Sequence, residues 1–307
     1  MSFVHSLLLL LAFVLFHNLS FAAPEKPPVI DMHLHAWPMG KDGPPDIPKN
    51  KAKMEKVLKS MRDNNVVYAA TSGPDAFLSY WKAQAPERLG LGPIFPCIDG
   101  LNPLFFRFEC FSNGENFPDV KWLEEQYTSG RYEVMGEMYN QYAGVAYDDA
   151  RMFPYYELAQ RLGIPVLFHT HSAPPLTAKR CCPEFRISNG HPLLLEEVLV
   201  KFPKLKVMIY HGNPLIYPRL LDLMAQFPKV HVGLTPYQRL PKERFHNILK
   251  QFKDAGKLNR VMFGSDGDNY EKAIAAYTSA EFLSRRELDS ILCENAGRFL
   301  GKPQLCE

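Results

Sequence analysis

The segment Val29–His35 reads VIDMHLH, an apolar run that ends in two histidines. Seven further short, apolar and β-branched segments follow it along the chain. Near-continuous apolar runs of this length are typical of strands buried on both faces of a parallel sheet. We therefore predict strands at residues 29–35, 66–72, 91–98, 132–138, 164–171, 205–212, 230–236 and 260–266.

The segments between these strands have the periodicity of amphipathic helices. Residues 52–65 place methionines, a valine and a leucine at helical spacing, and residues 191–202 do the same with leucines and valines. Eight strands alternating with helices over about 250 residues match a (β/α)8 barrel better than a doubly wound sheet. The sequence therefore predicts an α/β protein with a single (β/α)8 TIM barrel.

The N-terminus has the pattern of a signal peptide. The apolar run from Ser6 to Phe16 is shorter than the about 20 residues that span a bilayer. It is followed by SFAA (20–23), which has the small-x-small form of a signal-peptidase site. No lysine or arginine precedes the run, and an uncleaved membrane anchor is the alternative. We expect residues 1–22 to be removed and 23–307 to form one domain. The mature protein is then exported, periplasmic or extracellular, and not stably bound to a membrane.

Export would place the six cysteines in an oxidising compartment. Many pairings are open to six cysteines, and the short-loop pairs Cys97–Cys110 and Cys293–Cys306 are expected first. Adjacent Cys181 and Cys182 could hardly bond to each other without strain. A buried free thiol is about equally plausible for any single cysteine.

The charge balance argues against a nucleic-acid partner. Lys and Arg total 35 and Asp and Glu total 33, which gives a formal net charge of +2. Nucleic-acid-binding domains usually carry a basic face and a high pI. The hydrophobic fraction of 46% can form a core, which argues against disorder. We expect a small-molecule substrate and no nucleic acid.

Histidines and carboxylates gather at the ends of the predicted strands. In such a barrel the active site forms at the C-terminal ends of the strands. Five of the ten histidines fall there, with one glutamate and one aspartate. Imidazole and carboxylate together are the ligands of zinc and similar divalent ions. The residues at these strand ends are His33, His35, Glu137, His169, His171, His211 and Asp266.

The order of these residues resembles a known family. HxH after the first strand, His after the fifth, HG after the sixth and GSD after the eighth resemble the amidohydrolase superfamily. More narrowly, DMHLH, MGEM, VLFHTH, VMIYHGN, VMFGSD and ILCENAGRFLG are similar to its amidohydrolase-related (amidohydrolase 2) branch. That branch includes metal-dependent hydrolases and aminocarboxymuconate-semialdehyde decarboxylase-like enzymes. The resemblance runs from about Val29 to Leu300 and implies a TIM barrel of the metal-dependent hydrolase type.

The resemblance also implies roles for single residues. His211 would be a second-metal ligand or the residue that activates or polarises the reacting centre. Asp266 would also take the proton of a metal-bound water in hydrolytic members. Glu137 stands where some members have a bridging carboxylate and others have no catalytic group. The implied metal ligands are His33, His35, His169 and Asp266.

These residues predict an enzyme that uses metal-activated water. A divalent ion lowers the pKa of bound water to about 7, and a carboxylate can take its proton. We expect zinc, as one ion or as two if Glu137 bridges, with Asp266 and His211 as catalytic residues. The reaction would be hydrolysis of a small ester, lactone or amide. The alternative is non-oxidative decarboxylation of a small aromatic or muconate-like acid, and a metal-binding barrel without activity is a third hypothesis.

Residues on the substrate side are harder to place. Arg180 and Arg186 lie in the loop after the fifth strand, and guanidinium groups bind carboxylates bidentately. A carboxylate-bearing substrate would account for them, although ordinary solvated loop charges would look the same. Trp37 and Tyr139 follow strand ends and would line a pocket or serve packing. His171 is a candidate substrate contact, or a group that holds a ligand in place by a hydrogen bond.

Overall fold

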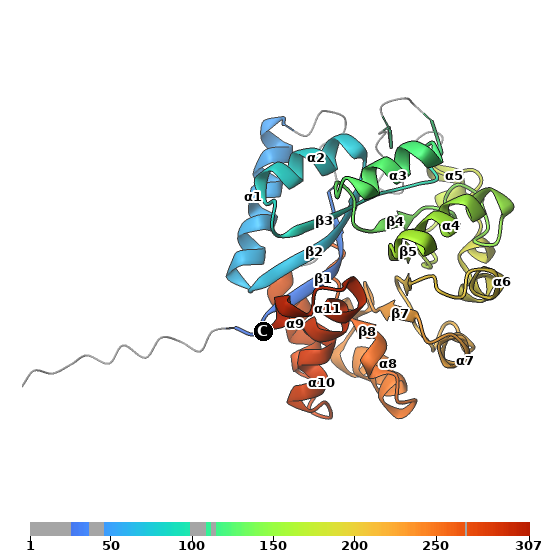
Figure 1. The fold of residues 1–307 in the computed structure, drawn as a ribbon. Helices are drawn as coiled ribbons and strands as arrows, with labels where there is room; N and C mark the ends of the chain where they lie inside the picture. The colour runs from blue at the N-terminus through green and yellow to red at the C-terminus, as the bar shows by residue number, and fades with distance from the viewer. Residues whose placement is uncertain (1–25, 37–45, 99–108, 112–114, 268) are drawn as a thin grey trace, which may run out of the picture.

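The computed structural model describes residues 26–36, 46–98, 109–111, 115–267 and 269–307. The expected signal segment 1–22 and Trp37 lie outside the described residues. Within them, parallel strands alternate with helices along the chain (Figure 1). The strands are β1 (Val29–His35), β2 (Val66–Gly73), β3 (Leu89–Pro93), β4 (Met135–Met138), β5 (Val166–Phe168), β6 (Val207–Ile209), β7 (Val230–Gly233) and β8 (Val261–Met262).

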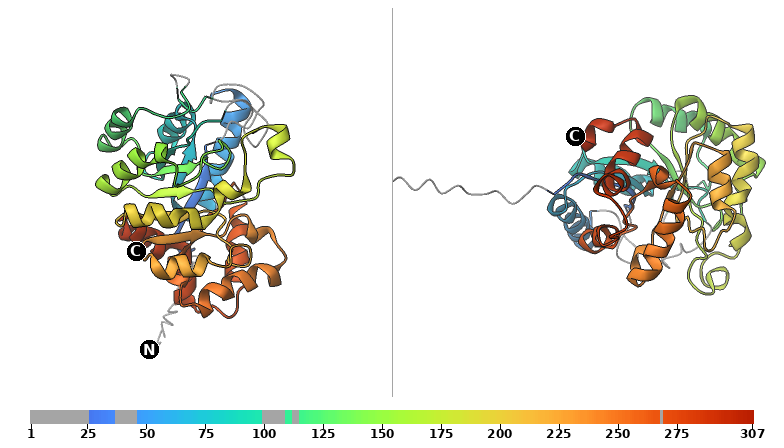
Figure 2. Two further views of the ribbon diagram at one scale, coloured as in Figure 1. Left: turned by 90° about the vertical axis from the view of Figure 1, so that its right-hand side faces the viewer. Right: turned by 90° about the horizontal axis from the view of Figure 1, so that it is seen from below.

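The helices lie around the outside of the strands (Figures 1 and 2). In the described part of the chain, none of them is both long and apolar enough to cross a bilayer. The α-helices are α1 (Pro48–Asp63), α2 (Asp75–Gln84), α3 (Val120–Thr128), α4 (Phe153–Leu162), α5 (Thr177–Arg180), α6 (Leu195–Lys201), α7 (Leu220–Gln226), α8 (Lys242–Asp254), α9 (Tyr270–Thr278), α10 (Arg285–Asp289) and α11 (Asn295–Leu300). Shorter helical turns are η1 (Ala150–Met152), η2 (Ile187–Gly190), η3 (Pro192–Leu194), η4 (Tyr237–Arg239), η5 (Leu258–Arg260), η6 (Ser290–Glu294) and η7 (Pro303–Cys306).

The strands close into a barrel in chain order. β1 to β3 form one ladder and β4 to β8 another, with each strand parallel to the next. The two ladders meet where the Glu133 N–H donates to the Leu91 carbonyl at 2.8 Å and where Phe95 bridges to Met138. On the other side, the Met32 N–H donates to the Phe263 carbonyl at 2.9 Å. The predicted (β/α)8 barrel is therefore confirmed.

Several strands are shorter than predicted. The predicted strands at 164–171, 205–212 and 260–266 pair only over β5, β6 and β8. The apolar pattern continues past the last paired residue because the following residues are still buried. His211 and Asp266 then adopt φ values of 58° and 52°, in the left-handed region that non-glycine residues rarely enter. The functional side chains after these strands therefore lie just beyond the ladder.

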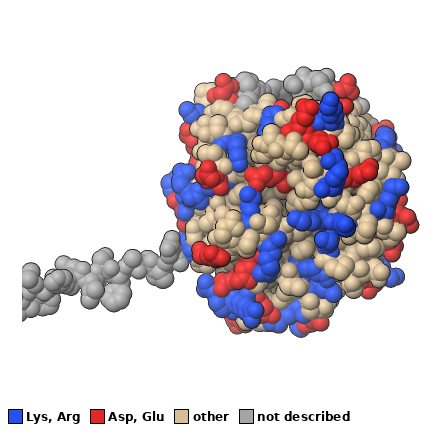
Figure 3. Space-filling view, in the orientation of Figure 1, with Lys and Arg blue, Asp and Glu red and all other residues tan. Residues whose placement is uncertain are grey.

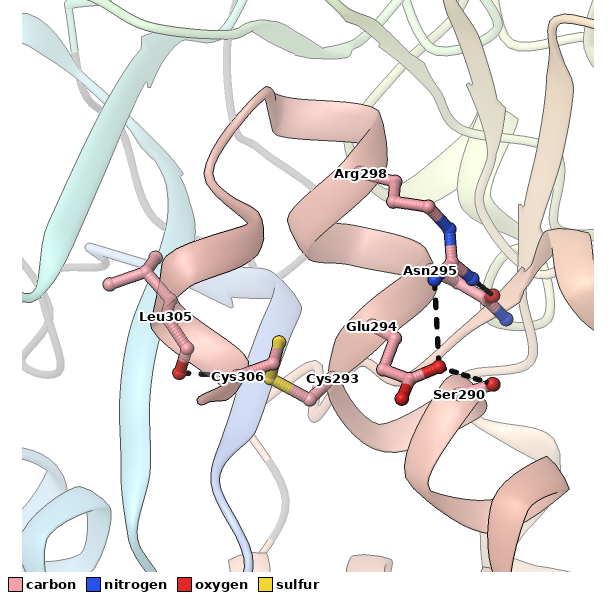
Figure 4. The surroundings of a disulfide bond; sticks show 7 residues. All are labelled: Ser290, Cys293, Glu294, Asn295, Arg298, Leu305 and Cys306. Atoms are coloured by element: carbon pink, nitrogen blue, oxygen red, sulfur yellow. Dashed lines mark hydrogen bonds and ion pairs between the residues drawn. A yellow bond between two sulfur atoms is a disulfide. The ribbon is translucent and has the colours of Figure 1, made fainter.

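A second core fills the inside of the barrel. Apolar side chains from the strands pack against residues of η6 and α11, which lie across the N-terminal end of the barrel. The Cys293–Cys306 disulfide joins η6 to η7 at this end (Figure 4). The interior residues are Ile30, Met32, Tyr68, Ala70, Val134, Leu167, Met208, Tyr210, Met262, Cys293, Ala296 and Phe299.

The disulfides agree with the sequence in two cases and differ in the third. Cys97–Cys110 and Cys293–Cys306 pair as predicted, each with Cα atoms 5.8 Å apart. Cys181 and Cys182 also pair with each other, so the expectation against that bond was wrong. Cys181 follows α5 with a non-helical backbone, and both cysteines are buried.

Charges on the surface are mixed. On the face shown in Figure 3, lysines and arginines are interspersed with aspartates and glutamates, in keeping with the net charge of +2.

One partly buried cluster lies near the N-terminal end of the barrel. The Glu133 carboxylate accepts a hydrogen bond from the Tyr68 hydroxyl at 2.7 Å and pairs with Lys302 at 2.9 Å. Burial alone would raise the pKa of Glu133, but Lys302 and Tyr68 outweigh it and lower that pKa.

We predict that Glu133→Gln lowers the free energy of unfolding by about 1–2 kcal/mol at pH 7. A lowered folded-state pKa stabilises the fold above the unfolded value of about 4.3, and this contribution disappears as pH falls through the folded value. Urea unfolding at pH 7 and pH 3 should show a smaller loss at pH 3 than at pH 7. Glu124→Gln, at an exposed ion pair with Arg161, serves as the control. Equal losses at both pH values would contradict the prediction.

Candidate active site

Six side chains meet at the C-terminal end of the barrel. Their ligand atoms form three overlapping groups, each with all atoms within 4.8 Å of one another. The sequence predicted every one of these residues, and the structure brings them together. They are His33 and His35 on β1, Glu137 on β4, His169 after β5, His211 after β6 and Asp266 after β8.

The two histidines of β1 face the cluster because the strand is irregular. Its pairing with β2 shifts register between Asp31 and Leu34. Met32 lies in the barrel interior, so strict alternation would point His33 away from the interior. The register shift lies where this alternation breaks. The two-residue spacing of His33 and His35 predicted that they share a face, but it did not predict this irregularity.

Glu137 lies at the centre of the cluster and is buried. Its Oε2 is 3.2 Å from His35 Nε2 and 3.5 Å from His33 Nε2. Its Oε1 is 2.6 Å from His169 Nδ1 and 3.7 Å from His211 Nε2. The two oxygens of one carboxylate therefore face two different pairs of histidines.

Asp266 lies beside the first pair. Its Oδ1 is 3.3 Å from His35 Nε2 and 3.6 Å from His33 Nε2, and its side chain is 22% exposed. Burial works to raise the pKa of Asp266, but the His33 and His35 imidazoles outweigh it and hold that pKa well below its usual range. His169 and His33 likewise outweigh burial and hold the pKa of Glu137 low. Both carboxylates are ionised at neutral pH.

Two of the imidazoles are oriented by one threonine. His33 Nδ1 is 2.8 Å from the Thr235 hydroxyl oxygen, and His211 Nδ1 donates to the Thr235 carbonyl. Because the Nδ1–H of His211 donates to a carbonyl, the neutral tautomer of this ring that the hydrogen bond selects has its lone pair at Nε2, the atom that faces the cluster. This geometry suits a ligand better than an oxyanion donor. No sequence pattern pointed to Thr235.

A buried aspartate fixes the first strand to the last. Asp31 Oδ1 accepts from the Ser265 N–H at 2.9 Å, and its Oδ2 accepts from the Ser265 hydroxyl at 2.6 Å and from Tyr270 at 2.7 Å. Gly264 lets the two segments approach, since a Cβ there would lie 2.8 Å from His33 Cβ. The GSD motif therefore positions Asp266 against β1, where its N–H donates to the His33 carbonyl at 2.7 Å.

The donor set fits a divalent cation. His33 Nε2 and His35 Nε2 are 3.1 Å apart, and carboxylate oxygens lie within 3.6 Å of both. Burial lowers the pKa of His33 and of His169, whereas the Asp266 and Glu137 carboxylates outweigh burial and raise the pKa of His35 to about 9. Converging imidazoles and ionised carboxylates are the ligands that zinc, manganese and related ions take.

A pocket of about 440 Å³ opens above the cluster. Tyr139 and His171 line it, as predicted from the sequence. Arg180 and Arg186 are not among its described lining residues, and the Arg186 guanidinium instead donates to the Pro183 and Phe185 carbonyls at 2.9 and 2.8 Å. Five of the six cluster residues, all except His33, line the pocket, and the other lining residues are Tyr139, Tyr142, His171, Ala173, Pro174, Pro175, Pro236 and Arg239.

His171 is neutral at the edge of this pocket. Burial and the neighbouring His211 and His169 rings lower the pKa of His171 to about 4. Its Nδ1 accepts a hydrogen bond from the Ala173 N–H at 3.2 Å. The ring proton therefore lies on Nε2, which makes this side chain a hydrogen-bond donor without charge.

The sequence model of the amidohydrolase family matches residues 119–302. The chain belongs to the amidohydrolase family. Members of this family are metal-dependent enzymes, and the cluster of histidines and carboxylates lies where such an ion would bind. No curated protein sequence matches the chain.

Solved structures share the fold of this chain. An uncharacterized TIM-barrel protein from Bordetella bronchiseptica has a TM-score of 0.63 at 17% identity, covering 90% of this chain and 99% of that chain. The 2,6-dihydroxybenzoate decarboxylase from Rhizobium gives 0.58 at 14%, covering 90% and 99%. A probable 2-pyrone-4,6-dicarboxylic acid hydrolase from Acinetobacter baumannii gives 0.59 at 17%, covering 89% and 99%. At these identities the likeness shows the TIM barrel.

We predict that a His33→Ala, His35→Ala double variant binds zinc at least about tenfold more weakly than the wild type, because it loses two imidazole ligands. Zinc titration with a competing chelator measures the affinity, and elemental analysis measures the content. His246→Ala is the control, since that histidine contacts Ala276 and Ser279 outside the cluster. Unchanged zinc affinity in the double variant would show that the ion binds elsewhere.

Proposed function

We propose that this protein is a metal-dependent hydrolase that cleaves a small ester, lactone or amide with water. The observation that carries the proposal is the position of Glu137 between two pairs of histidines. A carboxylate whose oxygens face separate donor sets can bridge two ions, as in other two-metal hydrolytic sites. We propose zinc as the metal and two ions as the count.

The cluster divides into two half-sites. His33, His35 and Asp266 would hold one ion with Glu137 Oε2, and the second would lie with Glu137 Oε1 and the two remaining histidines. A bound divalent ion lowers the pKa of a water molecule to about 7 and polarises a carbonyl oxygen. The residues of the second half-site are His169 and His211.

Asp266 moves the proton. It is ionised, it is partly open to the pocket, and it lies at the edge of the cluster. In this position it accepts the proton of the attacking water and returns it to the leaving oxygen or nitrogen. His171 donates its Nε2 proton as a hydrogen bond to the substrate, which orients the carbonyl without adding charge.

A decarboxylase is the second candidate. The amidohydrolase family includes decarboxylases, and the Rhizobium neighbour acts on 2,6-dihydroxybenzoate. The pocket wall supports it, because tyrosines and prolines form a mostly apolar space for an aromatic acid beside the ligand cluster. The substrate carboxylate would then be lost as CO2, and water would not be consumed.

We predict that Asp266→Asn lowers kcat by about 100-fold or more at saturating zinc, since the amide cannot accept the proton. Asp254→Asn, on the exposed face of α8, is the matched control and keeps full activity. Lactones, esters and amides are screened as substrates in water enriched in oxygen-18. One oxygen-18 atom in the product supports hydrolysis. Release of CO2 with no labelled oxygen would replace the hydrolase with the decarboxylase, and full activity of Asp266→Asn would remove its role.

We also propose that the protein is exported after cleavage of residues 1–22. The three disulfides among the described cysteines support this, because disulfides persist in oxidising compartments. N-terminal sequencing of the protein purified from its natural source should begin at Ala23 or Pro24. An intact Met1 terminus on a cytoplasmic protein would contradict the proposal.

A further inference from the structure

We propose that the Tyr142 hydroxyl donates a hydrogen bond to the negative oxygen that forms on the substrate carbonyl when water attacks it. This inference rests on the proposed function and deepens it, because it names a further catalytic residue of the same site. Hydrolysis of an ester, lactone or amide forms such an oxyanion, and donors aimed at it contribute strongly to catalysis. His211 does not supply the donor, since the tautomer selected by its hydrogen bond has a lone pair at the atom that faces the cluster.

Tyr142 lies in the turn after β4, beside the second half-site. Its N–H donates to the Tyr139 carbonyl at 2.9 Å, and the Tyr139 N–H donates to the Phe95 carbonyl at 2.9 Å. The Tyr142 ring contacts the His169 ring, with centroids 4.8 Å apart. The rings of Phe185 and Tyr139 also contact it, at 5.4 and 5.1 Å. The backbone and these rings hold the phenol next to a proposed metal ligand.

The Tyr142 hydroxyl differs from those of three other tyrosines near the cluster. The hydroxyls of Tyr147, Tyr210 and Tyr217 each donate to a backbone carbonyl. Among the described residues, the structure shows no hydrogen bond to the Tyr142 hydroxyl, although only 4% of this residue is exposed. A buried phenol usually finds a partner. This hydroxyl is therefore left for a group that enters the pocket.

The hydroxyl lies on the side of the ring that faces the cluster. Tyr142 lines the pocket of about 440 Å³ above the cluster, and it also borders a second pocket of about 310 Å³. Burial raises the pKa of Tyr142, and the Glu137 and Asp266 carboxylates raise it further. Both carboxylates must be near the hydroxyl to have this effect. The phenol stays protonated at neutral pH and can donate.

Tyr142 and His171 contact different histidines of the second half-site. The His171 ring lies 5.2 Å from the His211 ring, whereas the Tyr142 ring lies 4.8 Å from the His169 ring. A carbonyl oxygen has two lone pairs and can accept from both donors. Asp266 belongs to the first half-site, so the attacking water approaches from one half-site while the carbonyl oxygen is held at the other.

The proposed role changes no bond of the tyrosine. As water adds, its oxygen bonds to the carbonyl carbon, one water proton passes to Asp266, and an electron pair of the carbonyl double bond moves onto the carbonyl oxygen. The hydrogen bond from Tyr142 becomes stronger at this point because its acceptor is now charged. Tyr142 keeps its proton, and the bond weakens again when the leaving group departs with the proton held by Asp266.

The test uses the zinc-loaded full chain and two probes that differ in charge at the reacting oxygen. Phenyl methylphosphonate has the tetrahedral shape and the negative oxygen of the adduct between water and phenyl acetate, whereas phenylacetone has a neutral, planar carbonyl. Calorimetric titration should show that Tyr142→Phe binds the phosphonate about tenfold or more weakly than the wild type, because hydrogen bonds to charged groups are the stronger ones. Its affinity for phenylacetone should fall by less.

Elemental analysis should show the wild-type zinc content in Tyr142→Phe, since phenylalanine keeps the ring that packs against His169. Tyr80→Phe, which removes a hydroxyl from α2 outside the pocket, is the matched control and should bind both probes as the wild type does. Equal phosphonate affinities of the wild type and Tyr142→Phe, or no phosphonate binding by the wild type, would overturn the proposal. Equal losses for both probes would do the same, since the phenol would then only shape the pocket. A loss of zinc would show that Tyr142 acts by holding His169 and would also overturn it.

Oxygen-18 incorporation from phenyl acetate tests the hydrolase separately. With turnover, Tyr142→Phe should lower kcat by about tenfold or more and change KM little. Incorporation with an unchanged phosphonate affinity in Tyr142→Phe would keep the hydrolase and remove the role of Tyr142. No incorporation, together with phosphonate binding that depends on Tyr142, would reject hydrolysis of this ester and support the hydroxyl as a donor to a negative oxygen.

Discussion

The Glu137 carboxylate between two pairs of histidines is the constraint on which the rest of the site depends. An ionised, buried carboxylate is strongly unfavourable unless cations or donors surround it. Here each oxygen faces imidazole nitrogens, at 2.6 Å for His169 and 3.2 Å for His35. A cation bound between these groups would neutralise the negative charge of the carboxylate. The geometry therefore favours metal binding.

The barrel supplies what this arrangement needs. Side chains must come from strands that are distant in sequence, and only a closed sheet brings β1, β4 and β8 to one rim. Asp31 fastens the first strand to the segment after the last, and Thr235 orients the rings of His33 and His211. These residues hold the ligands without facing the pocket themselves, so their loss would loosen the site rather than remove a ligand.

Much of this was predictable from the sequence, and the reasons are specific. Apolar runs predicted the strands, and the histidines at their ends predicted the cluster, because parallel strands share one rim. The ends of β5, β6 and β8 were not predictable, since burial continues past the last paired residue. Arg239 was missed because β7, the strand before it, does not end in a histidine or a carboxylate. The Cys181–Cys182 bond was missed because it depends on the local backbone.

We propose that the Glu137 carboxylate would hold two metal ions, one beside each pair of histidines. Anomalous diffraction at the zinc absorption edge, from crystals grown with zinc, tests it most directly. The account predicts two peaks, one beside His33 and His35 and one beside His169 and His211, with the Glu137 carboxylate between them. A single peak that Glu137 does not touch, or no peak at the cluster, would contradict it.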